Sequence, residues 1–271
     1  MIGGQYMCEI FCFNSNTPKQ VNECLQCFYS HSEEHPHGWG LANMQSNEFV
    51  IDKEPVKATC SQHLKNILSN PVVGKNVFAH IRLATVGEII SPNCHPFTEA
   101  DDNNRSWMLI HNGTIFDYPK LDEYTDKENG DTDSERILLY IIDKINEFEK
   151  SKGALSTIKE RFNLLNEIVK ELSKNNKLNL MIYDGDLTYI HSNMRNSLYY
   201  LKNEEGFLVA TTPLSDDENW KPVELNKLFG LIDGNIIFES EEHENEYVLT
   251  EEHEKAMNDF LKSLNRDENN G

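Results

Sequence analysis

Cys8 is the residue with the clearest chemical potential in this sequence, because it opens the strand-like run of residues 8–13 and directly follows a methionine. If translation began at Met7, or if residues 1–7 were removed, Cys8 would carry a free α-amine beside its thiol. A nucleophile of pKa about 8.5 and a base of pKa about 7.7–8.0 would then share one residue. The alternative is a small buried hydrophobe, the usual fate of a free cysteine. Taken alone, the stretch favours burial.

Three later motifs carry groups that could hold a substrate. Arg82 ends an otherwise apolar strand, where its guanidinium needs an anion, either a carboxylate ligand or a structural ion pair. Asn112 and Gly113 follow another apolar run and could form an oxyanion hole, although Asn-Gly also marks ordinary hairpin turns. Asp133 lies in a capping-box pattern at a predicted helix start, where it could cap the helix or bind a substrate ammonium.

Together these groups describe one chemistry. An amino acid whose acyl group lies at the end of its side chain would use a thiol with its own base, an arginine for its carboxylate, an aspartate for its ammonium and two oxyanion donors. The sequence therefore predicts attack of Cys8 on a side-chain amide that is held at both of its main-chain charges.

The elements that must position these residues follow from hydrophobic periodicity. Strand-like runs come first, and two long helices follow near residues 132–145 and 155–172. Hairpin turns at residues 184–186 and 233–235 then return the chain to strands. A threonine and a proline at 17 and 18 predict a helix over residues 17–30. This order predicts an α+β fold in which two antiparallel sheets stack and helices pack outside them.

Composition narrows the class of protein. The 271 residues contain no Pro/Gly/Ser-rich linker, and the formal charge of −20 argues against nucleic acid and anionic membrane as principal partners. The sequence has no signal peptide, no apolar run long enough to span a bilayer and six cysteines at uneven spacing. These features predict a reduced, cytoplasmic protein.

Cys24 and Cys27, followed by His31, His35 and His37, offer a second chemistry based on zinc or on thiol redox exchange. Only three residues separate Cys27 from His31, fewer than a zinc finger needs, and both cysteines share a predicted helix face with core residues. No thioredoxin-like βαβ pattern surrounds them. The sequence therefore favours no metal and no cofactor.

Six motifs, in this order, resemble those of the class II glutamine amidotransferases, whose glutaminase domain has an N-terminal nucleophile. They are Met7-Cys8-Glu9, Gly38-Trp39-Gly40, residues 80–87, residues 93–97, His111-Asn112-Gly113 and residues 131–135. The resemblance covers residues 7 to about 234 and is greatest to the stand-alone glutaminase-domain branch, which includes a fungal subunit of glutathione breakdown.

The resemblance implies a four-layer αββα sandwich of the Ntn-hydrolase type. It also implies hydrolysis of the γ-amide of glutamine, or of a related γ-glutamyl compound, through a cysteine thioester. Cys8 would be the nucleophile and its α-amine the base, while Asn112 and the Gly113 N–H would form the oxyanion hole. Any ammonia would be released or passed to a partner enzyme subunit.

The same resemblance assigns the two ends of the substrate. Arg82 would bind its α-carboxylate and Asp133 its α-ammonium, and Thr85 and His95 lie in matching motifs on the pocket side. The expected ligand is thus a small γ-glutamyl molecule.

The sequence departs from the family pattern at three places. Residues 1–7 precede Cys8, which leaves three alternatives. Translation starts at residue 7, or a leader is removed, or the chain is a catalytically silent regulatory subunit that keeps its leader. We expect residues 1–7 to be a leader or pre-start segment and residues 8–271 to be one class II glutamine amidotransferase domain. Leu83 replaces a tryptophan of the hexosamine-synthesising branch, and His37 replaces an aspartate that stand-alone members tend to have.

Overall fold

Two stacked antiparallel sheets form the centre of the protein in the computed structural model, which describes residues 8–45 and 48–268. The first sheet contains, in spatial order, β11 (Lys221–Pro222), β9 (Tyr199–Lys202), β10 (Phe207–Ala210), β1 (Glu9–Gln20), β4 (Val73–Ile81), β2 (Trp39–Gln45) and β3 (Glu48–Glu54). The second contains β13 (Asn235–Glu239), β12 (Lys227–Ile232), β8 (Thr188–Ser192), β7 (Lys177–Tyr183), β6 (Ser106–Thr114) and β5 (Phe97–Ala100). The expected leader, residues 1–7, lies outside the described residues.

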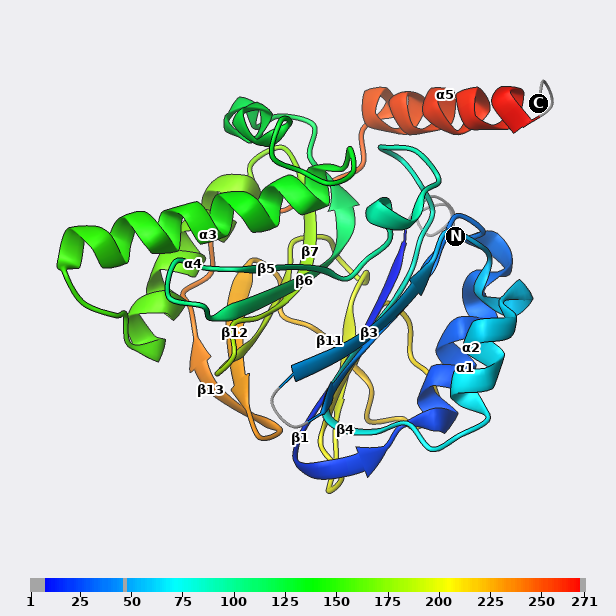
Figure 1. The fold of residues 1–271 in the computed structure, drawn as a ribbon, viewed down its shortest axis with the longest axis horizontal. Coiled ribbons are helices and arrows are strands. Elements are labelled where there is room, and N and C mark those ends of the chain that lie inside the picture. Colours follow the sequence, from blue (N-terminus) through cyan, green and yellow to red (C-terminus); the bar gives the residue numbers. More distant parts are fainter. Residues whose placement is uncertain (1–7, 46–47, 269–271) are drawn as a thin grey trace.

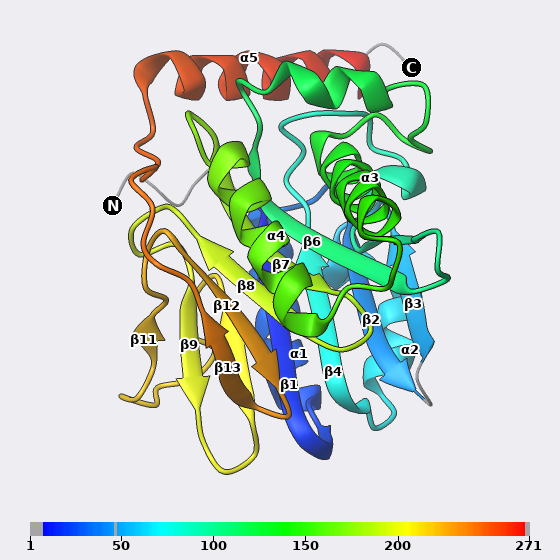
Figure 2. The same ribbon diagram turned by 90° about the vertical axis from the view of Figure 1, so that its left-hand side faces the viewer.

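Helices cover both outer faces of this pair of sheets. The first sheet carries α1 (Asn22–Ser30) and α2 (Gln62–Leu68), and the second carries α3 (Asp133–Lys152) and α4 (Ile158–Leu172), as Figure 1 shows. Helix α5 (Glu251–Glu268) lies across the end of the sandwich at which β1 begins (Figures 1 and 2). Four short 3₁₀ turns, η1 (His31–Glu34), η2 (Ala58–Cys60), η3 (Ser91–Asn93) and η4 (Pro119–Tyr124), join described elements. The predicted four-layer α+β architecture is confirmed.

Strand β1 has an apolar sequence because both of its faces are buried. Its side chains alternate, so that Phe11 and Phe13 pack against α1 while Ile10 and Cys12 face the second sheet. A third apolar layer lies between the second sheet and helices α3 and α4. Because β1 is buried between two of these layers, it reads as a continuous hydrophobic run rather than an alternating one.

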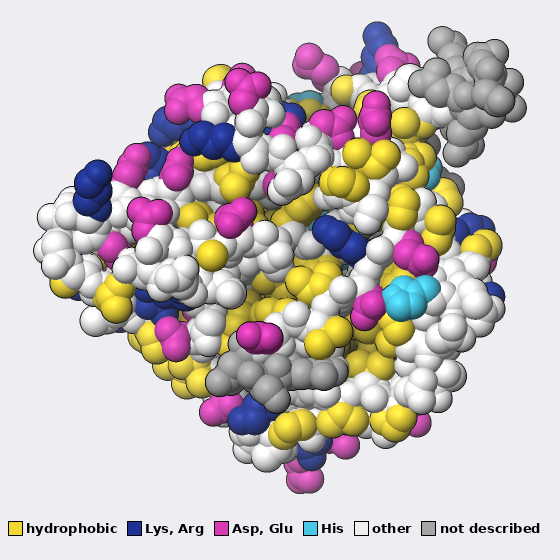
Figure 3. Space-filling model, viewed as in Figure 1, with side chains coloured by type: hydrophobic (Ala, Val, Ile, Leu, Met, Phe, Trp, Pro, Cys, Tyr) yellow, Lys and Arg dark blue, Asp and Glu magenta, His cyan; other side chains and the backbone are white. Residues whose placement is uncertain are grey.

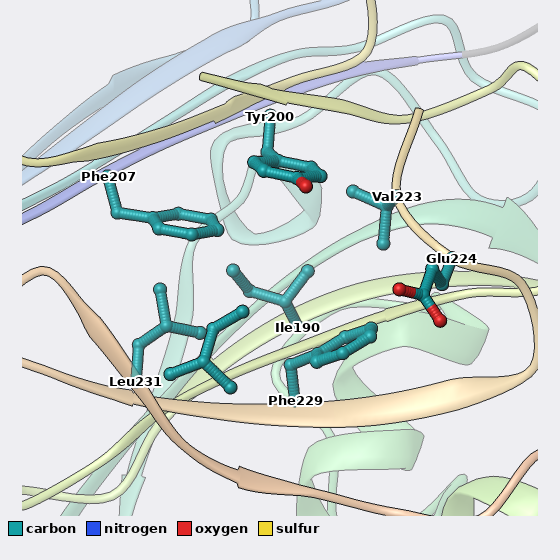
Figure 4. Close-up of a pocket in the computed structure, with 8 residues that line it drawn as sticks. Ile190, Tyr200, Phe207, Val223, Glu224, Phe229 and Leu231 are labelled. Atoms are coloured by element: carbon teal, nitrogen blue, oxygen red, sulfur yellow. The ribbon is translucent and has the colours of Figure 1, made fainter. Parts of the chain in front are cut away.

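An apolar pocket lies between the sheets, and Figure 4 shows it in close-up. Ile190 and Phe229 line it from the second sheet, and Tyr200 and Phe207 line it from the first. Phe207 pairs with Asn14, so the pocket lies several residues along β1 from Cys8. It is thus separate from the residues that could do chemistry.

Local signals set most element boundaries, with one error. The α3 and α4 helices begin behind Thr132 and Thr157, whose hydroxyls accept the backbone N–H of the residue three positions on. Both predicted hairpins are present, as β7–β8 and β12–β13. The helix predicted over residues 17–30 is wrong in its first part, because β1 continues to Gln20 after a register shift and α1 begins only at Asn22. A proline fits this irregular stretch because it needs no ladder hydrogen bond there.

Charge is dispersed over the surface drawn in Figure 3, where acidic side chains alternate with basic and polar ones rather than gathering in one patch. Among the described helices, none combines the length and apolar composition needed to cross a bilayer.

A buried ion pair fixes α4 to the β7–β8 hairpin. Arg161 is 3% exposed, and its Nε donates to Asp184 Oδ2 at 2.6 Å. The Asp184 carboxylate also accepts the Tyr189 hydroxyl at 2.6 Å and the Leu187 N–H at 2.8 Å. Asp186 is the second partner of Arg161, but half of its side chain is exposed. Asp184 therefore compensates most of the charge that this helix buries.

We expect Asp184→Ala to lower the free energy of unfolding by about 3–5 kcal/mol, because it leaves Arg161 buried without its main partner. Asp186→Ala is the matched control, and it should cost less than about 1 kcal/mol, since an exposed pair contributes little. Urea unfolding of both variants measures the difference. Equal losses in the two variants would contradict this ranking.

A pair of neutral histidines ties the segment after β13 to the second sheet. His191 Nδ1 donates to the Leu178 carbonyl at 2.7 Å, so its Nε2 is free to accept. His243 Nδ1 accepts the Asn245 N–H at 3.1 Å, so its Nε2 carries the proton that it donates to His191 Nε2 at 3.0 Å. Burial lowers the pKa of His191 to about 3 and that of His243 to about 4, the latter with the help of Lys170.

This pair predicts loss of stability in acid. Both folded-state pKa values lie below the unfolded value of about 6.5, so the unfolded chain binds more protons as pH falls from about 6.5 to about 4. The free energy of unfolding should fall over that interval, and less steeply in His243→Phe than in the wild type. Urea unfolding at several pH values measures both slopes. Identical slopes would show that the pair does not contribute.

Candidate functional site

The position of Cys8 follows from the pairing of β1 with β4. Glu9 lies opposite Ile81, so Cys8 falls beside the residues that leave β4. The Leu83 N–H donates to Cys8 Sγ at 3.4 Å, and Sγ in turn lies 3.4 Å from the Leu83 carbonyl. Burial raises the pKa of the Cys8 thiol, while Leu83 and the positive charges of Arg82 and Lys177 oppose that rise.

Arg82 organises the loop that follows β4. Its side chain is 3% exposed, and its two terminal nitrogens donate to the carbonyls of Val86 and Glu88, each at 2.8 Å, and to that of Gly87 at 3.3 Å. Among the described residues no carboxylate forms an ion pair with it, so the structural ion pair considered from sequence is not found there. Burial lowers the pKa of Arg82, and the nearby Cys8 raises it.

A second set of hydrogen bonds holds this loop against the segment before α3. The Asp131 carboxylate accepts the Glu88 N–H at 3.1 Å, and Asn93 Nδ2 donates to the Glu88 carbonyl at 2.9 Å. Gly87 has a φ of +77°, and a Cβ there would lie 2.7 Å from the Asp131 carboxylate, so only glycine fits. These hydrogen bonds fix the loop whose carbonyls accept from Arg82. Arg82 also interacts electrostatically with Asp133.

Asn112 and Gly113 lie inside β6, which continues to Thr114, so the hairpin-turn interpretation of Asn-Gly is wrong. Pairing with β7 from Met108 through Thr114 keeps both residues in the ladder. Asn112 is fully buried, and its Nδ2 donates to Thr211 Oγ1 at 3.5 Å. The sheet therefore holds the Asn112 amide at a fixed depth.

Asp133 is the first residue of α3, but it is not the cap. Thr132 accepts the Glu135 N–H at 3.3 Å and serves as the N-cap. The Asp133 carboxylate instead accepts the Ile115 N–H at 2.8 Å and the Ser134 hydroxyl at 3.2 Å. It thus fixes the helix start to the end of β6, and its charge raises the pKa of Cys8.

The remaining two predicted pocket residues are placed differently. The Thr85 hydroxyl lies 3.0 Å from that of Thr114, beside the end of β6. His95 is buried and stacks on His80 with ring centroids 3.9 Å apart, and neither of its ring nitrogens has a partner among the described residues. Burial lowers the pKa of His95 well below its usual value. No hydrogen bond in the described part of the chain joins His95 to Cys8.

The sequence interpretation missed one residue of the site, Lys177, and considered His37 only as a possible metal ligand and as a departure from the family pattern. Lys177 opens β7, is 4% exposed and donates from Nζ to Asn112 Oδ1 at 2.6 Å. His37 Nδ1 accepts the Ala84 N–H at 2.9 Å, and burial lowers its pKa to about 4, so that it stays a neutral acceptor. A charged residue at the start of an apolar strand was the available signal for Lys177, as it was for Arg82.

The zinc or redox alternative finds no support in the described residues. Cys24 and Cys27 pack from α1 against the core beneath that helix. No group of three or more potential metal-binding side chains occurs in residues 8–45 and 48–268. All six cysteines are free thiols.

The site therefore draws its side chains from both sheets and one helix. Cys8 and Arg82 come from the first sheet, Asn112 and Lys177 from the second, and Asp133 from α3. Charge interactions reach Cys8 from Arg82, Lys177 and Asp133, and a hydrogen bond joins Lys177 to Asn112. A partly buried thiol thus lies in the field of two cations and one carboxylate, with an amide bonded to one of the cations, an arrangement suited to nucleophilic attack on a carbonyl carbon.

Comparison with known proteins gives a consistent result. The family model for class II glutamine amidotransferases matches residues 7–207. A putative glutamine amidotransferase of Escherichia coli, YafJ, is 26% identical over 214 residues, covering 76% of this chain and 80% of that protein. The crystal structure of a predicted glutamine amidotransferase from Pseudomonas aeruginosa has a TM-score of 0.61 at 18% identity, covering 85% of this chain and 99% of that one. Glutamine phosphoribosylpyrophosphate amidotransferase from B. subtilis has a TM-score of 0.61 at 16% identity, with 86% of this chain matching 48% of that one.

The close contact at Gly113 predicts a strong effect of a single methyl group. A Cβ at this position would lie 2.0 Å from the Lys177 carbonyl and 2.3 Å from His111 Nε2, so β6 and β7 would have to separate. We expect Gly113→Ala to lower the free energy of unfolding by about 1–3 kcal/mol. Gly153→Asn is the control, since nothing lies within 4 Å there and asparagine tolerates its positive φ. Urea unfolding measures the free energy of unfolding of both variants. A Gly113→Ala variant as stable as the wild type would contradict the packing argument.

Proposed function

Since this chain belongs to the class II glutamine amidotransferase family, we propose that it hydrolyses the γ-amide of glutamine, or of a related γ-glutamyl compound, through a cysteine thioester. The observation that carries the proposal is that Arg82, Asp133 and Lys177 act on the Cys8 thiol from separate elements, with Asn112 hydrogen-bonded to Lys177. The expected substrate is a small γ-glutamyl molecule.

In the proposed reaction Cys8 Sγ attacks the amide carbon, and the carbonyl oxygen becomes an oxyanion. With Cys8 at the N-terminus, its α-amine accepts the thiol proton and then delivers it to the leaving nitrogen. Ammonia departs and leaves a thioester, and water then attacks the thioester to release the γ-carboxylate and the free thiol. The Asn112 amide and the Gly113 N–H are assigned to the oxyanion, where preorganised donors have their largest effect.

The two ends of the substrate are assigned to the charged residues beside the thiol. Arg82 has five N–H donors, and the loop carbonyls of Val86, Gly87 and Glu88 use only part of that set, which leaves donors for an α-carboxylate. Asp133 offers about four lone-pair sites and uses two of them, which leaves acceptors for an α-ammonium.

Secondary features of the pocket fit this assignment. The Thr85 hydroxyl lies beside Thr114 at the pocket side, and we assign His95 to the layer behind it. His37 stands where stand-alone family members tend to have an aspartate. Its neutral ring accepts the Ala84 N–H, and this hydrogen bond fixes the backbone that follows Leu83.

We place the reaction in the cytoplasm, because all six cysteines are free and a reducing compartment keeps them so. Ammonia leaves either to water or to a partner enzyme subunit. The second candidate function, a catalytically silent regulatory subunit, is favoured by residues 1–7, since an amide nitrogen at Cys8 cannot act as a base.

Glutamate release from glutamine and from γ-glutamyl peptides tests the proposal, with the full chain compared against a chain that starts at Cys8. We expect turnover in the second form, its abolition by Cys8→Ala and a loss of about 10²–10³ in kcat for Asn112→Ala. Cys60→Ala is the matched control, because this cysteine is exposed and lies outside the site. The proposal would be overturned if the Cys8→Ala variant still turned over substrate. It would also be overturned if the chain that starts at Cys8 turned over none of the substrates.

Intact mass of the protein from its native host separates the two candidate functions. A mass beginning at Cys8 favours catalysis. Retention of residues 1–7 favours the regulatory subunit.

A further inference from the structure

Lys177 is a buried cation without a carboxylate partner among the described residues. Its side chain is 4% exposed, and Nζ makes one hydrogen bond, to Asn112 Oδ1 at 2.6 Å. A buried ammonium is costly unless a negative charge or several acceptors compensate it. Besides the Asn112 oxygen, the group that acts on this ammonium is the Cys8 thiol, whose negative charge would favour it.

The contact with Lys177 decides which way the Asn112 amide points. An ammonium only donates hydrogen bonds, so the amide atom that faces it must be the oxygen. The amide nitrogen then lies on the opposite side, where one N–H approaches Thr211 Oγ1 at 3.5 Å. Thr211 Oγ1 itself accepts the Ile10 N–H at 2.9 Å, two residues along β1 from Cys8. Lys177 therefore directs the donor end of Asn112 away from itself and toward β1.

The charge of Lys177 also acts on the thiol. Lys177 and Arg82 both lower the pKa of Cys8 against the effect of burial. Conversely, burial lowers the pKa of Lys177 to about 7, and Cys8 is the group that opposes this fall. No hydrogen bond joins Nζ to Sγ in the described part of the chain, so the coupling acts through space and not by direct proton transfer.

We propose that Lys177 is a positioning residue, which turns the Asn112 amide so that its N–H₂ group can donate to an oxyanion and whose ammonium stabilises the Cys8 thiolate. The amide role rests on the proposed function, whereas the effect on the thiolate does not. The two cations, Lys177 and Arg82, would favour the reactive sulfur whether the nitrogen of residue 8 is an amine or an amide.

The pH dependence of Cys8 alkylation by iodoacetamide tests the charge role without any substrate. The full chain is used, and the peptide that contains Cys8 is quantified by mass spectrometry to separate it from the other five cysteines. Below about pH 7, where Lys177 carries its charge, alkylation should be about tenfold slower in Lys177→Met and Lys177→Gln than in the wild type, because the thiolate loses the neighbouring ammonium. Lys177→Arg should restore most of the wild-type profile because it keeps the charge.

Lys174→Met is the matched control, since Lys174 is an exposed lysine three residues earlier. It should alkylate as the wild type does. An unchanged alkylation rate below about pH 7 in folded Lys177→Met, or an equal slowing in Lys174→Met, would overturn the charge role.

A double-mutant cycle in glutamine turnover tests the amide role. If Lys177 acts through Asn112, the loss of kcat caused by Lys177→Met should be smaller in an Asn112→Ala background than in the wild type. Equal losses in the two backgrounds would overturn this role.

A titration that leaves Lys177 intact covers the case in which its variants do not fold. With ¹³C-labelled lysine, NMR should show one lysine that titrates far below the usual range, and its midpoint should fall further in Cys8→Ala. The same midpoint in both proteins would overturn the coupling. Because alkylation and NMR need no turnover, a failure of this proposal is distinguishable from a failure of the proposed reaction.

Discussion

The antiparallel pairing of β1 with β4 is the constraint on which the site depends. Because the strands run in opposite directions, the start of β1 lies beside the end of β4. The register Glu9 to Ile81 then places Cys8 against Leu83 and within the field of Arg82. A shift of one residue would exchange the faces of β1, so that Phe11 and Phe13 would leave the helix layer. Core packing on both sides of β1 therefore fixes the position of Cys8, the proposed nucleophile.

The second sheet contributes the remaining polar residues of the site. Asn112 and Lys177 come from β6 and β7, which contribute Ile110 and Met181 to the apolar layer between the sheets. Thr211 connects the two sheets, since its hydroxyl accepts from Ile10 and from Asn112. The proposed nucleophile and the proposed oxyanion donor thus belong to different sheets, and the distance between them is set by sheet packing rather than by a flexible loop.

Three buried polar side chains of this region, Arg82, Asn112 and Asp133, each have a defined hydrogen-bond partner, which holds them in place. Arg82 is held by loop carbonyls, Asn112 by Lys177, and Asp133 by the Ile115 N–H. Such a network is costly to disturb, because removing one member leaves another unpaired in a region of low dielectric constant. Neutral His37 belongs to the same arrangement, since protonation would cost it the lone pair that accepts the Ala84 N–H.

The sequence by itself determined the class of fold and most element boundaries, and it named Cys8, Arg82, Asn112 and Asp133 as candidate site residues. These features are local, because side-chain period, capping residues and polar residues at the ends of apolar runs can be read without knowing what lies opposite. Only the tertiary structure decided that the partners of Arg82 are carbonyls and that Asn112 meets Lys177, 65 residues away. It also extended β1 to Gln20, where the register with β4 outweighs the helix signal of a threonine and a proline. Which donor meets which acceptor depends on strand register and sheet stacking, and no local pattern in the chain carries that information.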